Sequence, residues 1–213
     1  MVKNLAFSKL YQTLLLCLVM VGLLIFVEQL SHPPFSWDTR ILTRAYSTSD
    51  PVLDRFFLII TWAGSLSFLI PMSISIAWVL VNLKFHLEAW LLTLSLIGVS
   101  IMTNLAKTLF DRHRPDLYPS IGLSPENASF PSGHTTQIMA FVFALYIVLR
   151  RLNANHLSWY TVIASFLALT VAYSRIYLQV HYPSDVIAGF IMAPMWVLSV
   201  VNGLKIIQNK SNR

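Results

Sequence analysis

The sequence has few charged residues. Only 11% of its 213 residues are Asp, Glu, Lys or Arg, and 56% are hydrophobic. A soluble domain carries about 25% charged residues, so the composition excludes a soluble globular protein and indicates an integral membrane protein. Cysteine is almost absent, because Cys17 is the only one, and neither an internal disulfide nor a cysteine-based metal site can form. The formal net charge is +6, but the basic residues stand singly between apolar runs, which argues against nucleic-acid binding.

Six apolar runs follow one another along the chain. They cover approximately residues 10–30, 56–82, 89–106, 134–149, 159–174 and 186–203. A spanning helix needs about 20 residues, with about 17 tolerated, so run 56–82 can span with tilt, whereas 134–149 and 159–174 must extend into polar neighbours. Run 10–30 is too long for a signal peptide and lacks a small-residue cleavage site. We therefore predict an all-α polytopic membrane protein in which residues 1–213 form a single domain, a bundle of six transmembrane helices.

Six crossings place both termini on one side of the membrane, and the positive-inside rule selects that side. The termini and the loops on their side hold eight Lys and Arg residues, against seven in the alternate loops. The bias becomes eight against four when Lys107, Arg114 and Arg175 are set aside as functional residues. We therefore expect cytoplasmic termini and outward loops. Within the first outward loop, residues 33–47 mix apolar residues with arginines, which fits either a short surface helix or an ordered loop.

Polar residues suited to phosphate chemistry gather in three segments. KTLFDRHRP ends the third predicted helix, FPSGH opens the fourth, and SRIYLQVHYPSD joins the fifth to the sixth. By the parity of the crossings, all three segments lie at the same membrane face. Basic residues, two histidines and an aspartate therefore converge there, which predicts an active site at one face of the membrane.

These segments resemble, motif by motif, the type 2 phosphatidic acid phosphatase superfamily of membrane phosphatases. Its signatures Lys-x6-Arg-Pro, Pro-Ser-Gly-His and Ser-Arg-x5-His-x3-Asp are met by Lys107 with Arg114-Pro115, by Pro131-Ser132-Gly133-His134, and by Ser174-Arg175 with His181 and Asp185. The motif core spans residues 107–185, and the six-helix arrangement extends the resemblance over the whole chain. The resemblance implies a lipid phosphatase in a cytoplasmic or inner membrane. With the orientation that the positive-inside rule selects, its active site would face the periplasmic or extracellular side.

Phosphoryl transfer spreads negative charge over three oxygens and depends mainly on positioning and electrostatic stabilisation. Lys107, Arg114 and Arg175 supply cations, and each arginine can bind two phosphate oxygens through its planar fork. Ser132 and Gly133 supply backbone N–H groups at a helix start, where unsatisfied donors and the macrodipole favour an anion. We predict that these five residues bind the phosphate.

The resemblance implies the roles of the remaining motif residues. His181 would attack phosphorus through an unprotonated ring nitrogen and form a phosphohistidine, while Asp185 would hold the other ring N–H. His134 would protonate the leaving alkoxide and later activate water.

The implied enzyme is a metal-independent phosphoric ester or anhydride hydrolase without cofactors, because the basic residues take the place of Mg²⁺. Its expected partners are membrane lipids and a lipid phosphate substrate, with no nucleic acid and no obligate protein partner. The sequence does not choose among phosphatidylglycerol phosphate, phosphatidic acid and undecaprenyl diphosphate.

Other interpretations of the same residues stay open. The basic residues could be interfacial anchors at helix ends, and Asp185 could simply cap the sixth helix. A vanadate-dependent haloperoxidase carries related motifs, although such enzymes are soluble and larger. A non-catalytic lipid transporter or flippase on the same fold is the alternative from another class, and the presence of both histidines and the aspartate argues against it.

Several residues near the motifs carry weaker signals. Asp111, Arg112 and Asp116 flank the first motif and are candidates for shaping phosphate or head-group access. Tyr182 is predicted to be an interfacial aromatic residue. Gly64 and the serines around it are predicted to allow close helix packing.

Overall fold

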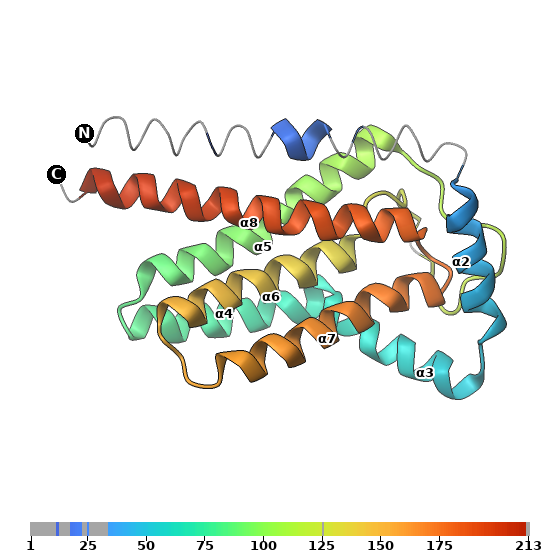
Figure 1. Ribbon diagram of the computed structural model, residues 1–213, viewed down its shortest axis with the longest axis horizontal. Coiled ribbons are helices and arrows are strands. Elements are labelled where there is room, and N and C mark those ends of the chain that lie inside the picture. The colour runs from blue at the N-terminus through green and yellow to red at the C-terminus, as the bar shows by residue number, and fades with distance from the viewer. Residues whose placement is uncertain (1–11, 13–17, 23–24, 26–33, 125, 212–213) are drawn as a thin grey trace.

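The computed structural model is a bundle of helices (Figure 1) and describes residues 12, 18–22, 25, 34–124 and 126–211. Within that part of the chain the regular elements are all helical, which confirms the all-α prediction. They are α2 (Ser36–Ser47), α3 (Pro51–Ile60), the 3₁₀ helix η1 (Thr61–Gly64), α4 (Leu66–Asn82), α5 (His86–Phe110), α6 (Gly133–Arg151), α7 (Leu157–Tyr177) and α8 (Pro183–Ser211). Most of the predicted run 10–30 lies outside the described residues.

Four helices are long and apolar enough to cross a membrane: α5, α6, α7 and α8 as far as Asn209. The pair formed by residues Pro51–Gly64 and Leu66–Asn82 passes the same test as one bent span. The chain is therefore a multi-pass membrane protein with four or five described spans. As predicted, α6 and α7 reach membrane length by including polar flanking residues, since α6 begins at Gly133 and ends at Arg151.

The second apolar run is not the single helix that its length predicts. It is bent by 44° between η1 and α4. Ser65 leaves the helical conformation, with φ −80° and ψ 150°, and its side chain accepts a hydrogen bond from the Phe68 N–H at 3.3 Å, so it is the N-cap that starts α4. The run has the length for one helix, but the Gly64-Ser65 pair stops one helix and starts another.

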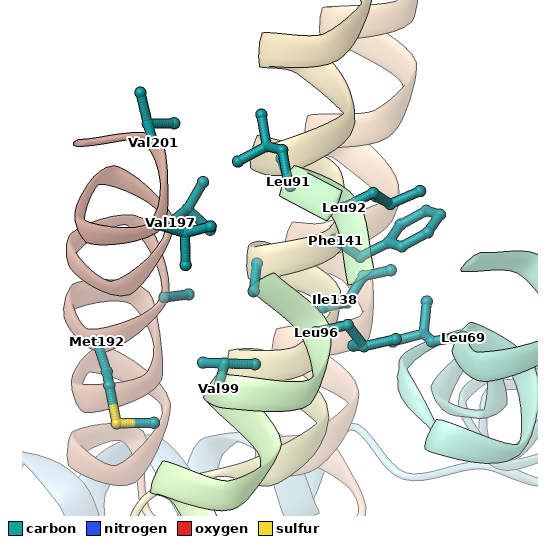
Figure 2. Packing of buried hydrophobic residues seen from close by; sticks show 14 of the residues in the cluster. Leu69, Leu91, Leu92, Leu96, Val99, Ile138, Phe141, Met192, Val197 and Val201 are labelled. Carbon is teal, nitrogen blue, oxygen red and sulfur yellow. The ribbon is translucent and has the colours of Figure 1, made fainter. Parts of the chain in front are cut away.

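The core of the bundle lies between α5, α6 and α8, and α6 contacts α4, α5, α7 and α8. Figure 2 shows Leu92 and Leu96 of α5 among the side chains of Ile138 and Phe141 of α6, with Met192 of α8 on the facing helix. On the outside, large apolar side chains such as Leu109 and Phe166 are more than two-thirds exposed, at 78% and 72%. An apolar exterior around an apolar core is what a bilayer requires.

Helix α2 lies across the end of the bundle where the α5–α6 loop and the α7–α8 connection run (Figure 1). For residues 33–47 the sequence fitted either a short surface helix or an ordered loop, and the structure shows a helix over Ser36–Ser47. Leu42 and Ala45 of α2 are buried against a small cluster that includes Ile176 and Tyr182. Asp38, on the same helix, is fully buried, and its partners lie beside the predicted active site.

Candidate active site

A cavity of about 240 Å³ opens where α5 ends, α6 begins and α7 ends. The motif residues Lys107, Arg114, Gly133, His134, Arg175 and His181 line it together with Leu66, Thr103, Asn104, Asn127 and Gln137. The three motif segments therefore meet at one site, as the parity of the crossings predicted. The two other predicted residues, Ser132 and Asp185, are fully buried directly behind it.

Two of the three cations are held by the loop that precedes α6. Lys107 Nζ donates to the Ala128 carbonyl oxygen and, at 3.4 Å, to Asn127 Oδ1. Arg114 donates from Nε to the Asn127 carbonyl oxygen at 2.9 Å and from one terminal nitrogen to the Val180 carbonyl oxygen at 2.6 Å. Burial lowers the pKa of Arg114 from 12.5, and Asp185 opposes that shift. Carbonyl groups of this loop, together with that of Val180 between α7 and α8, thus hold these two side chains in place before any anion binds.

The third cation, Arg175, is held from the opposite side. One of its terminal nitrogens donates to Thr61 Oγ1 at 2.6 Å, so the bend between α3 and α4 contributes directly to the site. Arg175 is 5% exposed and its buried Nε has no hydrogen-bond partner among the described residues. A buried guanidinium donor without a partner is costly, and an anion in the cavity would satisfy it.

His181 lies between a carboxylate and a guanidinium. Its Nδ1 is 3.4 Å from Asp185 Oδ2, and its Nε2 is 3.3 Å from a terminal nitrogen of Arg114. Burial, followed by the charges of Arg114, Arg175 and Lys107, holds the pKa of His181 well below 6.5. The ring is therefore neutral, and with Nδ1–H directed at Asp185 the unprotonated nitrogen is Nε2, beside the cations.

The start of α6 departs in part from the prediction. Gly133 lines the cavity, and because no side chain in the described part of the chain caps this helix, its first N–H groups keep the unsatisfied character that favours an anion. The Ser132 N–H, in contrast, already donates to the Asp185 carbonyl oxygen at 3.1 Å. Its predicted contact with phosphate does not fit this arrangement; Ser132 instead ties the start of α6 to the start of α8.

Asp185 combines the two roles that the sequence left open. It lies in the first turn of α8, and its Oδ2 accepts from the Tyr182 N–H at 2.9 Å, as an acidic residue does in half of a capping box. The same oxygen accepts from the Ser129 hydroxyl and faces His181. Capping and orientation of the histidine therefore coexist in one carboxylate.

Behind Asp185 lie Arg112, which the sequence offered only as a candidate for shaping phosphate or head-group access, and Asp38 and Ser184, which it did not assign to the site. Arg112 is 1% exposed, and its NH1 donates to Asp185 Oδ1 at 2.5 Å, while its NH2 reaches Asp38 Oδ2 at 3.4 Å. Asp38 also accepts from both the backbone and the hydroxyl of Ser184, at 2.9 and 2.8 Å. Burial raises the pKa of Asp38 from 3.8, and the Ser184 hydrogen bonds and Arg112 counteract this. Arg112 thus supports the carboxylate behind His181.

Tyr182 is a further correction. It is 6% exposed, and the Arg112 guanidinium lies 4.3 Å from the centroid of its ring. It is therefore a buried cation–π partner and not the interfacial aromatic residue that the sequence suggested.

Membrane-spanning helices around a cavity with buried cations and two histidines define a multi-pass membrane protein whose site suits an anionic group. The chain matches the PAP2 superfamily over residues 88–206. It is 32% identical over 161 residues to phosphatidylglycerophosphatase B of Bacillus subtilis (strain 168), which covers 73% of this chain and 77% of the relative. It is also 33% identical over 109 residues to lipid A 1-phosphatase of Rhizobium etli, over 47% of this chain and 43% of that one.

A solved structure is similar over nearly the whole chain. It is the crystal structure of a transmembrane PAP2-type phosphatidylglycerolphosphate phosphatase from Bacillus subtilis, with a TM-score of 0.74 and 26% identity, covering 94% of this chain and 97% of that chain. The chain belongs to the PAP2 superfamily and is a membrane phosphatase of that family. The resemblance read from the motifs is thereby confirmed.

Proposed function

We propose that the chain, acting as a single membrane-embedded phosphatase domain, removes a terminal phosphate from a lipid phosphate or lipid diphosphate by way of a phosphohistidine. The observation that carries the proposal is the placement of His181, whose Nδ1 faces Asp185 at 3.4 Å and whose Nε2 lies beside Arg114 at 3.3 Å, inside the cavity lined by the cations. A neutral imidazole oriented in this way is a nucleophile aimed at an anion site.

The reaction proceeds in two displacements. In the first, a bond forms between His181 Nε2 and phosphorus while the bond from phosphorus to the lipid oxygen breaks, and His134 gives a proton to that oxygen. In the second, His134 takes a proton from water, the water oxygen bonds to phosphorus, and the nitrogen–phosphorus bond breaks. Lys107, Arg114 and Arg175 stabilise the charge on the phosphoryl oxygens in both steps.

The position of the cavity supports a lipid substrate. Helix α6 has 19 residues and rises about 28 Å, close to the roughly 30 Å thickness of the hydrocarbon region. His134, in its first turn, therefore lies at head-group depth. A phosphate bound there leaves its acyl or prenyl chains in the bilayer, and their binding energy positions the reacting phosphorus.

Phosphate release by the purified protein tests the function. Long-chain phosphatidylglycerol phosphate, phosphatidic acid and undecaprenyl diphosphate would be compared with glycerol 3-phosphate in detergent micelles. At least one lipid is expected to exceed glycerol 3-phosphate in kcat/KM by several orders of magnitude, with activity retained in excess chelator. Equal efficiencies would reduce the assignment to a general phosphatase, no release from any substrate would favour a transporter, and loss of activity in chelator with recovery on adding Mg²⁺ would contradict the metal-free mechanism.

We further propose that the cavity faces outward and the termini lie in the cytoplasm, because the Lys and Arg residues outside the motifs concentrate on the other side. In a Cys17→Ser background, Leu123→Cys introduces a thiol at a position that is 99% exposed in the α5–α6 loop. This thiol should react with a membrane-impermeant reagent in intact cells, whereas Asn155→Cys in the α6–α7 loop should react only after lysis. The opposite pattern would reverse the orientation.

A further inference from the structure

Polar side chains line the cavity one helical turn deeper than the predicted phosphate ligands. Thr103 precedes Lys107 by four residues on α5, and Gln137 follows Gly133 by four residues on α6; both line the cavity. Because α5 ends and α6 begins at this face, four residues correspond to about 6 Å towards the membrane centre. Asn104 lines the cavity at the same depth.

Gln137 is the least explained of these side chains. It is 8% exposed, and within the described part of the chain its amide makes no hydrogen bond. A Cβ atom built on Gly133 would lie 3.9 Å from Gln137 Nε2, so the side chain extends from its deeper backbone position back along the cavity wall, and its amide lies beside Gly133. Neighbouring hydroxyls are satisfied: Thr103 Oγ1 donates to the Val99 carbonyl oxygen at 2.8 Å and Thr136 Oγ1 to that of Ser132 at 2.7 Å.

Because the Gln137 amide has no partner among the described residues and lines the cavity, its hydrogen-bonding groups are available to whatever occupies that space. Polar residues inside a membrane span that face a cavity commonly contact the substrate. Among the described residues, Ser73, Ser95 and Gln179 also have buried side-chain oxygens without a partner, but none of these three residues lines the cavity. Gln137 is thus distinguished by combining burial, an unpaired amide and direct contact with the space next to the proposed phosphate position.

We infer that Gln137, assisted by Asn104, forms a second subsite that hydrogen-bonds an acceptor oxygen of the substrate beyond the scissile phosphate. The inference rests on the proposed function. The chemistry required is an oxygen that follows the scissile phosphate by a few bonds. It is present as the ester carbonyls of a glycerolipid, the phosphodiester of phosphatidylglycerol phosphate, or the second phosphate of a prenyl diphosphate. A prenyl monophosphate places only hydrocarbon there.

The consequence is selection against prenyl monophosphates. A site built to hydrogen-bond a substrate rejects an analogue that lacks the partner, because the buried amide is then left unpaired. For one amide we expect phosphatidic acid to exceed a prenyl monophosphate of similar chain length by about ten- to a hundredfold in kcat/KM.

The test measures kcat/KM for phosphatidic acid and prenyl monophosphate in the wild type and in Gln137→Leu. Leucine has a similar volume and no polar atoms, so the variant should lose about ten- to a hundredfold on phosphatidic acid and gain up to about tenfold on the prenyl monophosphate. Asn104→Leu should shift the ratio in the same direction by less. Asn82→Leu, at the far end of α4 where the side chain donates to the Trp78 carbonyl oxygen, is the matched control and should leave the ratio unchanged.

Two further substrates identify the oxygen. With an ether-linked phosphatidic acid, the effect of Gln137→Leu should disappear if an ester carbonyl is the partner. With a prenyl diphosphate, the effect should be largest if a second phosphate is the partner. An equal loss on all substrates would assign Gln137 to the phosphate site and overturn the inference, as would an unchanged substrate ratio. Gln137→Met provides a second variant if leucine prevents folding, and absence of phosphate release in the wild type would instead contradict the proposed function.

Discussion

Replacement of Arg112 by glutamine tests whether the buried ion pairs behind the histidine contribute to catalysis. Arg112 contacts Asp185 at 2.5 Å and Asp38 at 3.4 Å, and the three side chains are 0–2% exposed. Removing one partner of a buried ion pair costs about 3–5 kcal/mol, since the other charge is left uncompensated. That is a large fraction of a typical stability of about 5–15 kcal/mol, so a clear fall in thermal stability is expected.

The catalytic effect follows from the position of Asp185. Its Oδ2 is 3.4 Å from His181 Nδ1, and without Arg112 the carboxylate can shift or take up a proton. A displacement of about 1 Å at a reacting group can cost about a hundredfold in rate. Arg112→Gln should therefore lower kcat by about a hundredfold with KM nearly unchanged, and the slowed step should be phosphoenzyme formation in a single turnover. Arg112→Lys keeps the charge but loses the fork, so it should recover only part of the rate.

Glu88→Gln is the control for loss of an ion pair. Glu88 lies 3.6 Å from Arg151 at the other end of α5, and these side chains are 15% and 28% exposed. Such pairs contribute about 0–1 kcal/mol, so stability and kcat should both stay near those of the wild type. The reasoning about Arg112 would be refuted if Arg112→Gln lowered thermal stability but kept kcat within about twofold of the wild type.

Three more predictions concern the histidines and the bend. His181→Ala should abolish turnover and the acid-labile phosphoenzyme, whereas His134→Ala should slow turnover and let phosphoenzyme accumulate, because water is no longer activated. Acid quenching with labelled substrate detects the phosphoenzyme. Absence of phosphoenzyme from every quenched sample would count against covalent catalysis. Since the pKa of His181 lies well below 6.5, the ring stays unprotonated on mild acidification, and His134, the proton donor of this step, is no less protonated at the lower pH. The rate constant of phosphoenzyme formation should therefore not fall between about pH 7.5 and about pH 6; a decline centred near 6.5 would show that His181 titrates normally. Gly64→Ala should lower the free energy of unfolding by about 1–3 kcal/mol and reduce turnover, because its Cβ would lie 2.5 Å from Val171 Cγ1 and 3.2 Å from His134 Cβ. Gly203→Ala should do neither, since its Cβ would have no atom of the described residues within 4 Å; equal melting temperatures for the two variants would contradict this packing argument.

The sequence was sufficient to predict which motif residues share a site. Lys107, His134 and His181 are separated by tens of residues, yet each lies next to the boundary of an apolar run, and counting crossings assigns them to one membrane face. The cavity lining agrees with that assignment. Hydropathy and helix parity are strong signals because the bilayer forces every span to be a complete helix.

The partners behind the site gave no comparable signal. Asp38 is 74 residues from Arg112 along the chain, in a segment whose mixture of apolar and basic residues fitted a loop as well as a helix. A single carboxylate there looks like an ordinary acidic residue in the first turn of a helix. The bend at Gly64 was hidden as well, because an uninterrupted apolar run is equally compatible with one tilted helix. For Asp38 the decisive information is a tertiary contact, which local composition does not contain, whereas the bend depends on the local N-cap formed by Ser65, which a hydropathy average does not detect.

The contact between Thr61 and Arg175 bears on where the working unit of this protein begins. The superfamily match covers residues 88–206, but Thr61 binds Arg175 and Asp38 accepts from Arg112 and Ser184 from outside that range. A fragment trimmed to the matched region would keep every motif residue and still leave one phosphate-site arginine and the support of Asp185 incomplete. We therefore expect that an active fragment must start before α2, and that exchanging only the matched region between relatives yields chimaeras whose activity depends on whether positions 38 and 61 are exchanged with it.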